Sequence, residues 1–361
     1  MRINKIQEIT FDTEATIVAA TLSGANEVLL LMNDGNVIKH KVNEKKSQHL
    51  FSVKTPFHHT DGGFDTTAPS SIYTIDEIVV VVNDYKRHGF IHHPGNYHAL
   101  HLWRGEYHAD ISCYPIALFK DGNGIPHIIY GEDWNHVQIM NLDTLQVLTA
   151  SKSLIAENAE ERHIEFYGKN KETNKLRWPR PYDYFFGKLS VSPNQKRFLS
   201  SGWVWGSSDC YNVYDIENFI NSSRIAHINV GVWEHENRAF CWTDDETVAV
   251  AYNPSMEGDE DATADSPFEI HFHKIQGNGT EIEKKIQIDD PLVATSTRCY
   301  NRHLESFIAY SQKLGLAIIS LDGKTVFQDR NLKIKGSITE GETEFLLAWE
   351  GKMIKIYSCS V

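Results

Sequence analysis

The chain has 361 residues, of which 41% are hydrophobic, 23% charged and 11% aromatic, and its formal net charge is −13. This composition excludes a disordered chain, and the acidic balance disfavours a nucleic-acid partner, because phosphate binding needs a Lys/Arg surface. The chain opens without an apolar targeting segment, has no run of 18 apolar residues, and has five widely spaced cysteines. We therefore expect a reduced cytoplasmic protein without a membrane partner.

The first predicted strand, Ile3–Phe11, alternates in polarity and has no neighbouring hairpin partner. After it, one strand pattern recurs seven times at a mean spacing of about 53 residues, close to the length of one propeller blade with loop insertions. The seven copies are Asn36–Val42, Tyr97–Trp103, Asn135–Leu142, Tyr211–Ile216, Phe268–Ile275, Gly315–Leu321 and Lys352–Ser358. A further strand precedes each copy, at Glu27–Met32, Glu77–Val82, His127–Gly131, Lys196–Ser201, Glu246–Tyr252, Glu305–Tyr310 and Thr343–Trp349.

Turns rich in Asp, Asn and Gly separate these strands, and amphipathic helices between them are almost absent, which favours antiparallel sheets. The predicted fold is an all-β, seven-bladed β-propeller with four-stranded blades. The blades are expected at about 15–54, 68–109, 115–150, 184–230, 238–288, 292–328 and 334–358, with an insertion at 151–182. The last blade lacks one strand, so the N-terminal strand 3–11 is expected to complete it. Six or eight blades would also fit, because the second and seventh units are thin.

The insertion begins with a predicted short helix, Leu154–Glu161, and continues through a segment rich in Arg, Trp and Tyr. These residue types dominate binding hot spots. Two interpretations stay open: Trp178 and Tyr182 pin the insertion onto the propeller, or they contact a partner.

The unit Leu189–Trp203 resembles a WD40-type repeat, and with Tyr130–Asn135 and Trp203–Trp205 it is similar to uncharacterised bacterial propellers. The resemblance implies partner binding and no chemistry. The blades lack the opening Gly-His pair and the closing Trp-Asp pair of true WD40 repeats, so the polar network of those residues does not carry over.

The long irregular segments fall in one class of connection. If the strands of a blade are labelled A to D from the axis outward, the B–C loops and the D-to-A connectors lie on one face. The long segments are Asn83–Asn96, Gly202–Asp209, Asn253–Pro267, Thr55–Thr67 and Ser151–Tyr182, whereas the opposite turns, such as Leu142–Thr144, are short. Because long loops on a rigid scaffold usually carry its function, this asymmetry predicts the working face.

The eighteen histidines favour no metal site. A set drawn from His58, His59, His88, His92 and His93 with Asp61 or Asp65 is conceivable, but no H-E-x-x-H motif or paired C-x-x-C exists. We expect solvated loop histidines, no metal and no cofactor.

Two local motifs on the predicted face have both a structural and a functional interpretation. Glu132–His136 is either a self-bonded turn or a polar ligand site. The indoles of Trp203 and Trp205 share one side of an extended chain, where they either pack against a neighbouring blade or form an aromatic platform. The acidic run Glu257–Asp265 is expected to be a solvated loop.

No nucleophile elbow or phosphate-binding loop is present, so the first hypothesis is a non-enzymatic scaffold that binds a protein or peptide, and the acidic charge would suit a basic partner. One version is a bacterial immunity or antitoxin-like partner. The alternatives are a propeller hydrolase or lyase with acids and histidines at the axial mouth, and a ligand sensor. The binding face is predicted to contain Arg87, His88, Asp133, Trp134, Trp178, Arg180, Tyr182, Trp203 and Trp205.

Overall fold

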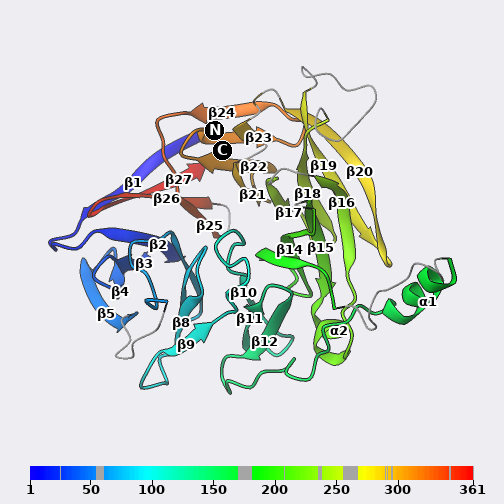
Figure 1. Ribbon diagram of the computed structural model, residues 1–361. Helices are drawn as coiled ribbons and strands as arrows, with labels where there is room; N and C mark the ends of the chain where they lie inside the picture. Colours follow the sequence, from blue (N-terminus) through cyan, green and yellow to red (C-terminus); the bar gives the residue numbers. More distant parts are fainter. Residues whose placement is uncertain are drawn as a thin grey trace. The chain divides into compact units, whose positions relative to one another are not determined.

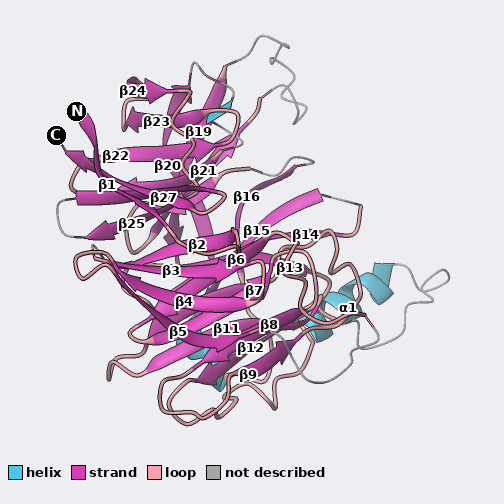
Figure 2. Cartoon of the chain, turned by 90° about the vertical axis from the view of Figure 1, so that its left-hand side faces the viewer, coloured by secondary structure: helices cyan, strands magenta, loops and turns pink. Residues whose placement is uncertain are grey.

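β-Strands form nearly all of the regular structure in the computed structural model, and the helices are few and short (Figure 2). The structure describes all residues except 25, 54–60, 170–180, 207, 235–237, 255–266, 289, 291, 294–295, 341–342 and 361. The strands form seven antiparallel sheets in chain order, which confirms the seven-bladed β-propeller (Figure 1). No helix within the described ranges is long and apolar enough to cross a membrane.

The chain divides into two compact units. Unit 1 comprises Met1–Arg104, Asn237–Lys274 and Glu281–Val361, and unit 2 comprises Gly105–Glu236 and Ile275–Thr280.

Five sheets lie wholly or mostly in unit 1. The first contains β2 (Ile17–Gly24), β3 (Glu27–Met32), β4 (Asn36–Lys41) and β5 (Lys46–Ser52). The second contains β6 (Ser70–Ile75), β7 (Ile78–Asn83), β8 (His88–His92) and β9 (Leu100–Trp103). The fifth contains β17 (Phe240–Trp242), β18 (Thr247–Tyr252), β19 (Phe268–Gln276) and β20 (Gly279–Ile288). The sixth contains β21 (Thr297–Asn301), β22 (Ser306–Ser311), β23 (Gly315–Ser320) and β24 (Thr325–Asp329). The seventh contains β25 (Gly336–Glu340), β26 (Thr343–Glu350), β27 (Met353–Ser360) and β1 (Arg2–Thr10).

Two sheets lie in unit 2. The third contains β10 (Ile116–Lys120), β11 (Pro126–Asp133) and β12 (His136–Asn141). The fourth contains β13 (Phe185–Val191), β14 (Arg197–Val204), β15 (Ser208–Asp215) and β16 (Ile228–Glu234). Helix α1 (Ala159–Lys169) lies between the two sheets in sequence, and α2 (Ile216–Asn221) follows β15.

The predicted pairing of the chain's two ends is confirmed. Strand β1 lies antiparallel to β27, with Arg2 opposite Ser360 and Thr10 opposite Met353. Figure 1 shows the blue N-terminal strand alongside the red C-terminal strand. The N-terminal strand therefore supplies the outermost strand of the seventh sheet and covers an edge that would otherwise expose unpaired backbone groups.

The third sheet has three strands rather than four. In place of the fourth strand there is an isolated antiparallel bridge between Met140 and Val147. The Thr149 hydroxyl accepts a hydrogen bond from the Ile139 N–H at 2.8 Å, so a side chain satisfies a backbone donor that a regular strand would have paired.

One strand of the second sheet corrects the sequence analysis. The segment 83–96 was expected to be an irregular B–C loop, but it contains β8, and the predicted third strand 97–103 corresponds to the fourth strand, β9. Gly89 makes β8 resemble a loop in the sequence, but the structure needs a glycine there. A Cβ at this position would lie 2.6 Å from Cγ1 of Val82.

The predicted helix at 154–161 is also corrected, because α1 begins only at Ala159. The preceding residues are held by hydrogen bonds to another segment: the Ile225 N–H donates to the Ile155 carbonyl at 3.0 Å, and the Glu157 N–H donates to the Ile225 carbonyl at 2.9 Å. These long-range hydrogen bonds outweigh the local helix propensity of Leu154–Ala156.

Within each unit, neighbouring sheets share their apolar cores. In unit 1, buried side chains of the first sheet pack with those of the seventh on one side and of the second on the other. The fifth and sixth sheets share another core cluster, and so do the sixth and seventh. In unit 2, one cluster joins the third and fourth sheets. Central strands such as β7 are buried along their whole length, which explains their continuous apolar sequence.

Burial of His273 on β19 predicts a loss of stability in acid. Burial, followed by the charges of His271, Arg238 and Lys285, lowers the pKa of His273 from 6.5 to about 4. The buried neutral imidazole therefore does not reduce the free energy of unfolding above pH 6.5. As the pH falls from 6.5 to about 4, the unfolded state binds a proton that the folded state does not, and the free energy of unfolding falls by about 3 kcal/mol. In urea unfolding at pH 7 and 4.5, we expect His273→Gln to flatten this dependence and His98→Gln, at an exposed position, to retain it. Equal pH dependence in the two variants would contradict the prediction.

Candidate functional site

The most prominent surface feature of unit 2 is a group of aromatic rings, which we call the aromatic patch. It comprises Tyr107, His108, Trp134, Phe185, Trp203 and Trp205. The rings come from the connection before β10, the β11–β12 turn, the start of β13, and the end of β14 with its following turn. Apart from the strand residues at the base, these are D-to-A and B–C connections, the loop class that the sequence analysis singled out.

The base of the patch is a stack of rings. Phe185 is fully buried, and its ring lies 3.6 Å from that of Trp203 with an angle of 7° between the planes. The Trp134 ring lies 4.3 Å from the Phe185 ring. Close packing of large rigid rings leaves them little freedom, so the base is a firm support for the residues above it.

Two rings of the patch are open to solvent. Tyr107 is 49% exposed and Trp205 is 53% exposed, and their ring centroids are 6.2 Å apart. Trp205 also makes an edge contact with Phe185 at 5.3 Å. The exposed rings therefore rest on the buried stack and form an apolar surface that is fixed in place.

Polar contacts hold the backbone beneath the rings. The Asp133 carboxylate accepts a hydrogen bond from the Trp134 N–H at 2.8 Å, and the Asn135 amide donates to the Tyr182 carbonyl at 2.9 Å. The Trp203 indole N–H donates to the Ser112 hydroxyl at 2.9 Å. The residues of the 132–136 turn thus have structural partners, and the turn serves mainly to present Trp134.

Two backbone features of this region help to place the rings. Gly202 lies against the Tyr184 ring, where a Cβ would fall 2.6 Å from Cζ, so no larger residue fits without displacing that ring. His108 has a φ of 54°, in the left-handed region that non-glycine residues seldom adopt. Its ring nevertheless contacts Trp203 at 5.4 Å and Trp205 at 5.8 Å.

The predicted face residues divide into four groups. Asp133, Trp134, Trp203 and Trp205 come together in unit 2 as described. Tyr182 is also in unit 2 but is buried, and its hydroxyl lies 2.8 Å from that of Tyr214. Tyr182 therefore belongs to the core and anchors the segment that precedes β13.

The other predicted face residues are not part of the aromatic patch. Arg87 and His88 are in unit 1. Trp178 and Arg180 lie outside the described residues, as does the acidic run 257–265.

Arg87 and His88 belong to a polar chain on the second sheet. The His88 Nε2 lies 2.9 Å from an Asp61 carboxylate oxygen, and its Nδ1 lies 2.9 Å from Nε2 of His101. The Arg87 guanidinium lies 3.2 Å from Asp61 and 4.6 Å from the Trp103 ring centroid. Since both nitrogens of the His88 ring have partners, this imidazole binds neighbouring side chains and is not available as a metal ligand.

The proposed histidine metal set is only partly described. His58 and His59 lie outside the described residues, and Asp65 is engaged by Lys86 in an ion pair of 2.5 Å. No group of three or more His, Cys, Asp or Glu side chains placed to hold a metal ion occurs in the part of the chain that the structure describes.

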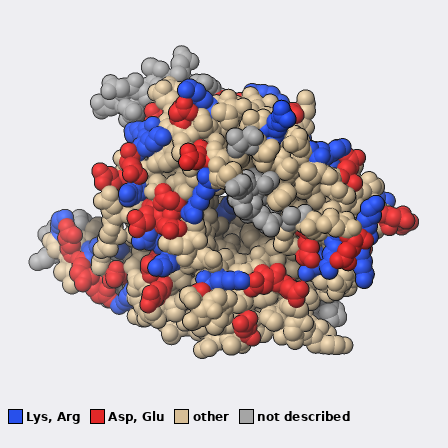
Figure 3. Space-filling model, turned by 180° about the vertical axis from the view of Figure 1, so that it is seen from behind, with Lys and Arg blue, Asp and Glu red and all other residues tan. Residues whose placement is uncertain are grey.

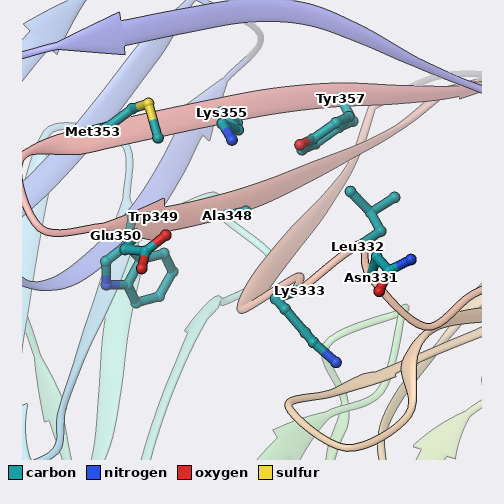
Figure 4. Close-up of a pocket in the computed structure, with 9 residues that line it drawn as sticks. All are labelled: Asn331, Leu332, Lys333, Ala348, Trp349, Glu350, Met353, Lys355 and Tyr357. Carbon is teal, nitrogen blue, oxygen red and sulfur yellow. The ribbon is translucent and has the colours of Figure 1, made fainter.

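A small pocket lies on the seventh sheet. Figure 4 shows side chains of β26, β27 and the segment 331–333 around it, including Lys333, Trp349 and Tyr357. Lys333 Nζ donates to two backbone carbonyls, those of Gln312 and Arg330, at 2.7 and 2.6 Å. The cavity volume of about 140 Å³ is below the ~300–1,000 Å³ of typical ligand pockets. We therefore take the aromatic patch as the candidate site.

Three members of the patch were missed from the sequence: Tyr107, His108 and Phe185. Phe185 follows a segment of alternating aromatic residues that looks like ordinary strand core. Tyr107 and His108 lie in the connection between the second and third sheets, where neighbouring Gly105 and Asp110 were the available loop signals.

A scan of protein-family models found no match to this chain, and a search of curated proteins found none either. Among solved structures, the chain is similar to the crystal structure of the computationally designed Ika8 protein. The two share 9% sequence identity, the match covers 97% of this chain and 98% of that chain, and the TM-score is 0.49. A likeness of this size carries no argument about function, and the WD40-like resemblance stays a prediction.

Proposed function

We propose that the protein is a non-enzymatic scaffold that binds a protein or peptide through the aromatic patch. The observation that carries the proposal is the pairing of two half-exposed rings, Tyr107 and Trp205, with a buried stack that fixes their positions. Large rigid side chains lose little conformational entropy when a partner covers them, and for that reason Trp and Tyr are frequent hot spots in interfaces.

The alternative, a propeller enzyme, rests on the Asp61–His88–His101 chain. An acid–base residue must reach the atom it protonates. The His88 side chain is only 2% exposed and has Asp61 and His101 against its two nitrogens. This arrangement suits a buried structural chain of hydrogen bonds, whereas the Tyr107 and Trp205 rings of the aromatic patch are accessible. The geometry therefore favours the binding scaffold.

A peptide selection tests the proposal. A displayed library of random twelve-residue peptides is selected on the wild-type protein, and the affinity of enriched synthetic peptides is measured by calorimetry. We expect Trp205→Ala and Tyr107→Ala each to weaken binding by about 2–4 kcal/mol, the usual cost of removing a central aromatic anchor. The melting temperature is expected to change little, because both side chains are half exposed.

Tyr97→Ala is the matched control. Tyr97 is an aromatic residue that is 94% exposed and lies in unit 1, so its removal tests whether any surface ring supports binding. Selected peptides that bound the Trp205 and Tyr107 variants as tightly as the wild type would refute the proposed site.

A further inference from the structure

Three of the segments that carry the aromatic patch contain acidic but no basic charged side chains. Over the face drawn in Figure 3, Lys and Arg side chains lie among Asp and Glu side chains. The segments 105–114, 132–136 and 203–209 contain no Lys or Arg. They contain five carboxylates: Glu106, Asp110, Glu132, Asp133 and Asp209. Every ring of the patch except Phe185 thus lies in a segment whose formal charges are all acidic.

Carboxylates lie close to the backbone that carries the rings. Asp133 accepts the Trp134 N–H, and its carboxylate also lies against the backbone of Gly105, two residues before Tyr107. Asp110 is exposed in the same connection as Tyr107. A cation placed over the exposed rings would therefore lie on the same segments as these two carboxylates.

Two other tryptophans of this chain have a cationic side chain over the ring. Trp103 is 50% exposed, and the Arg87 guanidinium lies 4.6 Å from its ring centroid. The ammonium of Lys335 lies 4.8 Å from the ring centroid of Trp349. Trp205 is as exposed as Trp103, yet no Lys or Arg of the described residues lies over its ring.

We propose that the aromatic patch binds a segment of a partner protein that presents Arg or Lys, with the cation over Trp205 or Tyr107 and the flanking carboxylates pairing with it. This inference rests on the proposed function and names the chemistry of its partner. The negative face of an aromatic ring attracts a cation, and Arg also stacks on it with its planar guanidinium. An acidic segment would meet like charge at these flanks, and a neutral one would gain no electrostatic attraction from them.

The test uses fluorine NMR on protein labelled with 5-fluorotryptophan, in which Trp205→Phe assigns the Trp205 signal. The probes are capped peptides of four Ser-Arg repeats, with matched peptides of four Ser-Gln and four Ser-Glu repeats. We expect the Ser-Arg peptide to shift the Trp205 signal in a saturable way and the other two to leave it unchanged. Reading the signal at Trp205 separates binding at the patch from general attraction to an acidic chain.

Neutralising the flanking acids tests the electrostatic part. The double substitution Asp133→Asn and Asp110→Asn is expected to raise the Kd of the Ser-Arg peptide at least fivefold. Asn retains the oxygen that accepts the Trp134 N–H, so the turn keeps its hydrogen bond. Asp143→Asn, in a short turn of unit 2 outside the segments that carry the rings, is the control and is expected to leave the Kd unchanged.

The outcomes separate the two proposals. If the Ser-Gln peptide shifted Trp205 as strongly as the Ser-Arg peptide, or the double variant kept its affinity, the cation would not be recognised and this inference would fall. If library selection yielded neutral peptides that required Trp205 and Tyr107, the inference would fall while the scaffold function stood. If the Ser-Arg peptide bound without moving the Trp205 signal, it would be held elsewhere, and the inference would again be overturned.

Discussion

Deletion of residues 1–11 is expected to lower the free energy of unfolding by on the order of 4 kcal/mol and the melting temperature by about 5 °C. The deletion removes β1, which pairs with β27 from Arg2 to Thr10, and leaves that strand with an unpaired edge. It also removes apolar contacts, because Ile9 and Phe11 pack against the core of the first and seventh sheets and Ile3 against that of the sixth and seventh. Thermal unfolding followed by circular dichroism measures the effect.

Two controls make this experiment specific. Ile6 lies at the register shift between Lys5 and Gln7 and is exposed, so Ile6→Ser is expected to change stability by less than about 0.5 kcal/mol. A synthetic peptide of residues 1–11 added to the truncated protein is expected to restore the melting temperature, since an extended peptide can add to a free sheet edge. An unchanged melting temperature in the deletion would show that β1 contributes nothing to closure.

The strand order was predictable because its signal repeats along the chain. Seven copies of a buried strand with a preceding strand define the sheets even when one copy is misplaced. In the second sheet, the strand at His88–His92 was assigned to a loop, since two histidines and Gly89 suggest a loop in isolation. The neighbouring Val82 side chain makes that glycine necessary, and this contact belongs to the folded state alone.

The candidate site was predictable only where its residues are close in sequence. Trp203 and Trp205 are two residues apart, so their shared side follows from strand geometry. Phe185 and Tyr107 contact these residues from other segments of the chain, and no local sequence pattern predicts those contacts. For Tyr182, the sequence left anchoring and partner contact open, and it was included in the predicted face. Its buried hydroxyl is paired with that of Tyr214, so the structure agrees with anchoring.

The last prediction concerns Phe185, which we expect to support the exposed rings without contacting the partner. Phe185→Ala removes a fully buried ring that stacks on Trp203 and contacts Trp134 and Trp205. The expected loss of unfolding free energy is about 3–5 kcal/mol, as is typical when a large core residue is cut to Ala. Because the remaining rings lose their common support, peptide affinity is expected to fall as well.

Phe198→Ala separates support of the site from general destabilisation. Phe198 is equally buried in the same unit but packs in the core with Tyr214 and Phe219, away from the exposed rings. We expect this variant to lose a similar free energy of unfolding while keeping the Trp205 fluorine signal and the peptide affinity of the wild type.

Phe185→Leu, which refills most of the volume, is expected to recover part of the stability and part of the peptide affinity that Phe185→Ala loses. If Phe185→Ala and Phe198→Ala affected affinity equally under conditions where both are folded, the stack beneath Trp205 would have no special part in binding. Support by Phe185 requires the two variants to differ, because only one of them removes a ring that touches the surface on which the partner is expected to lie.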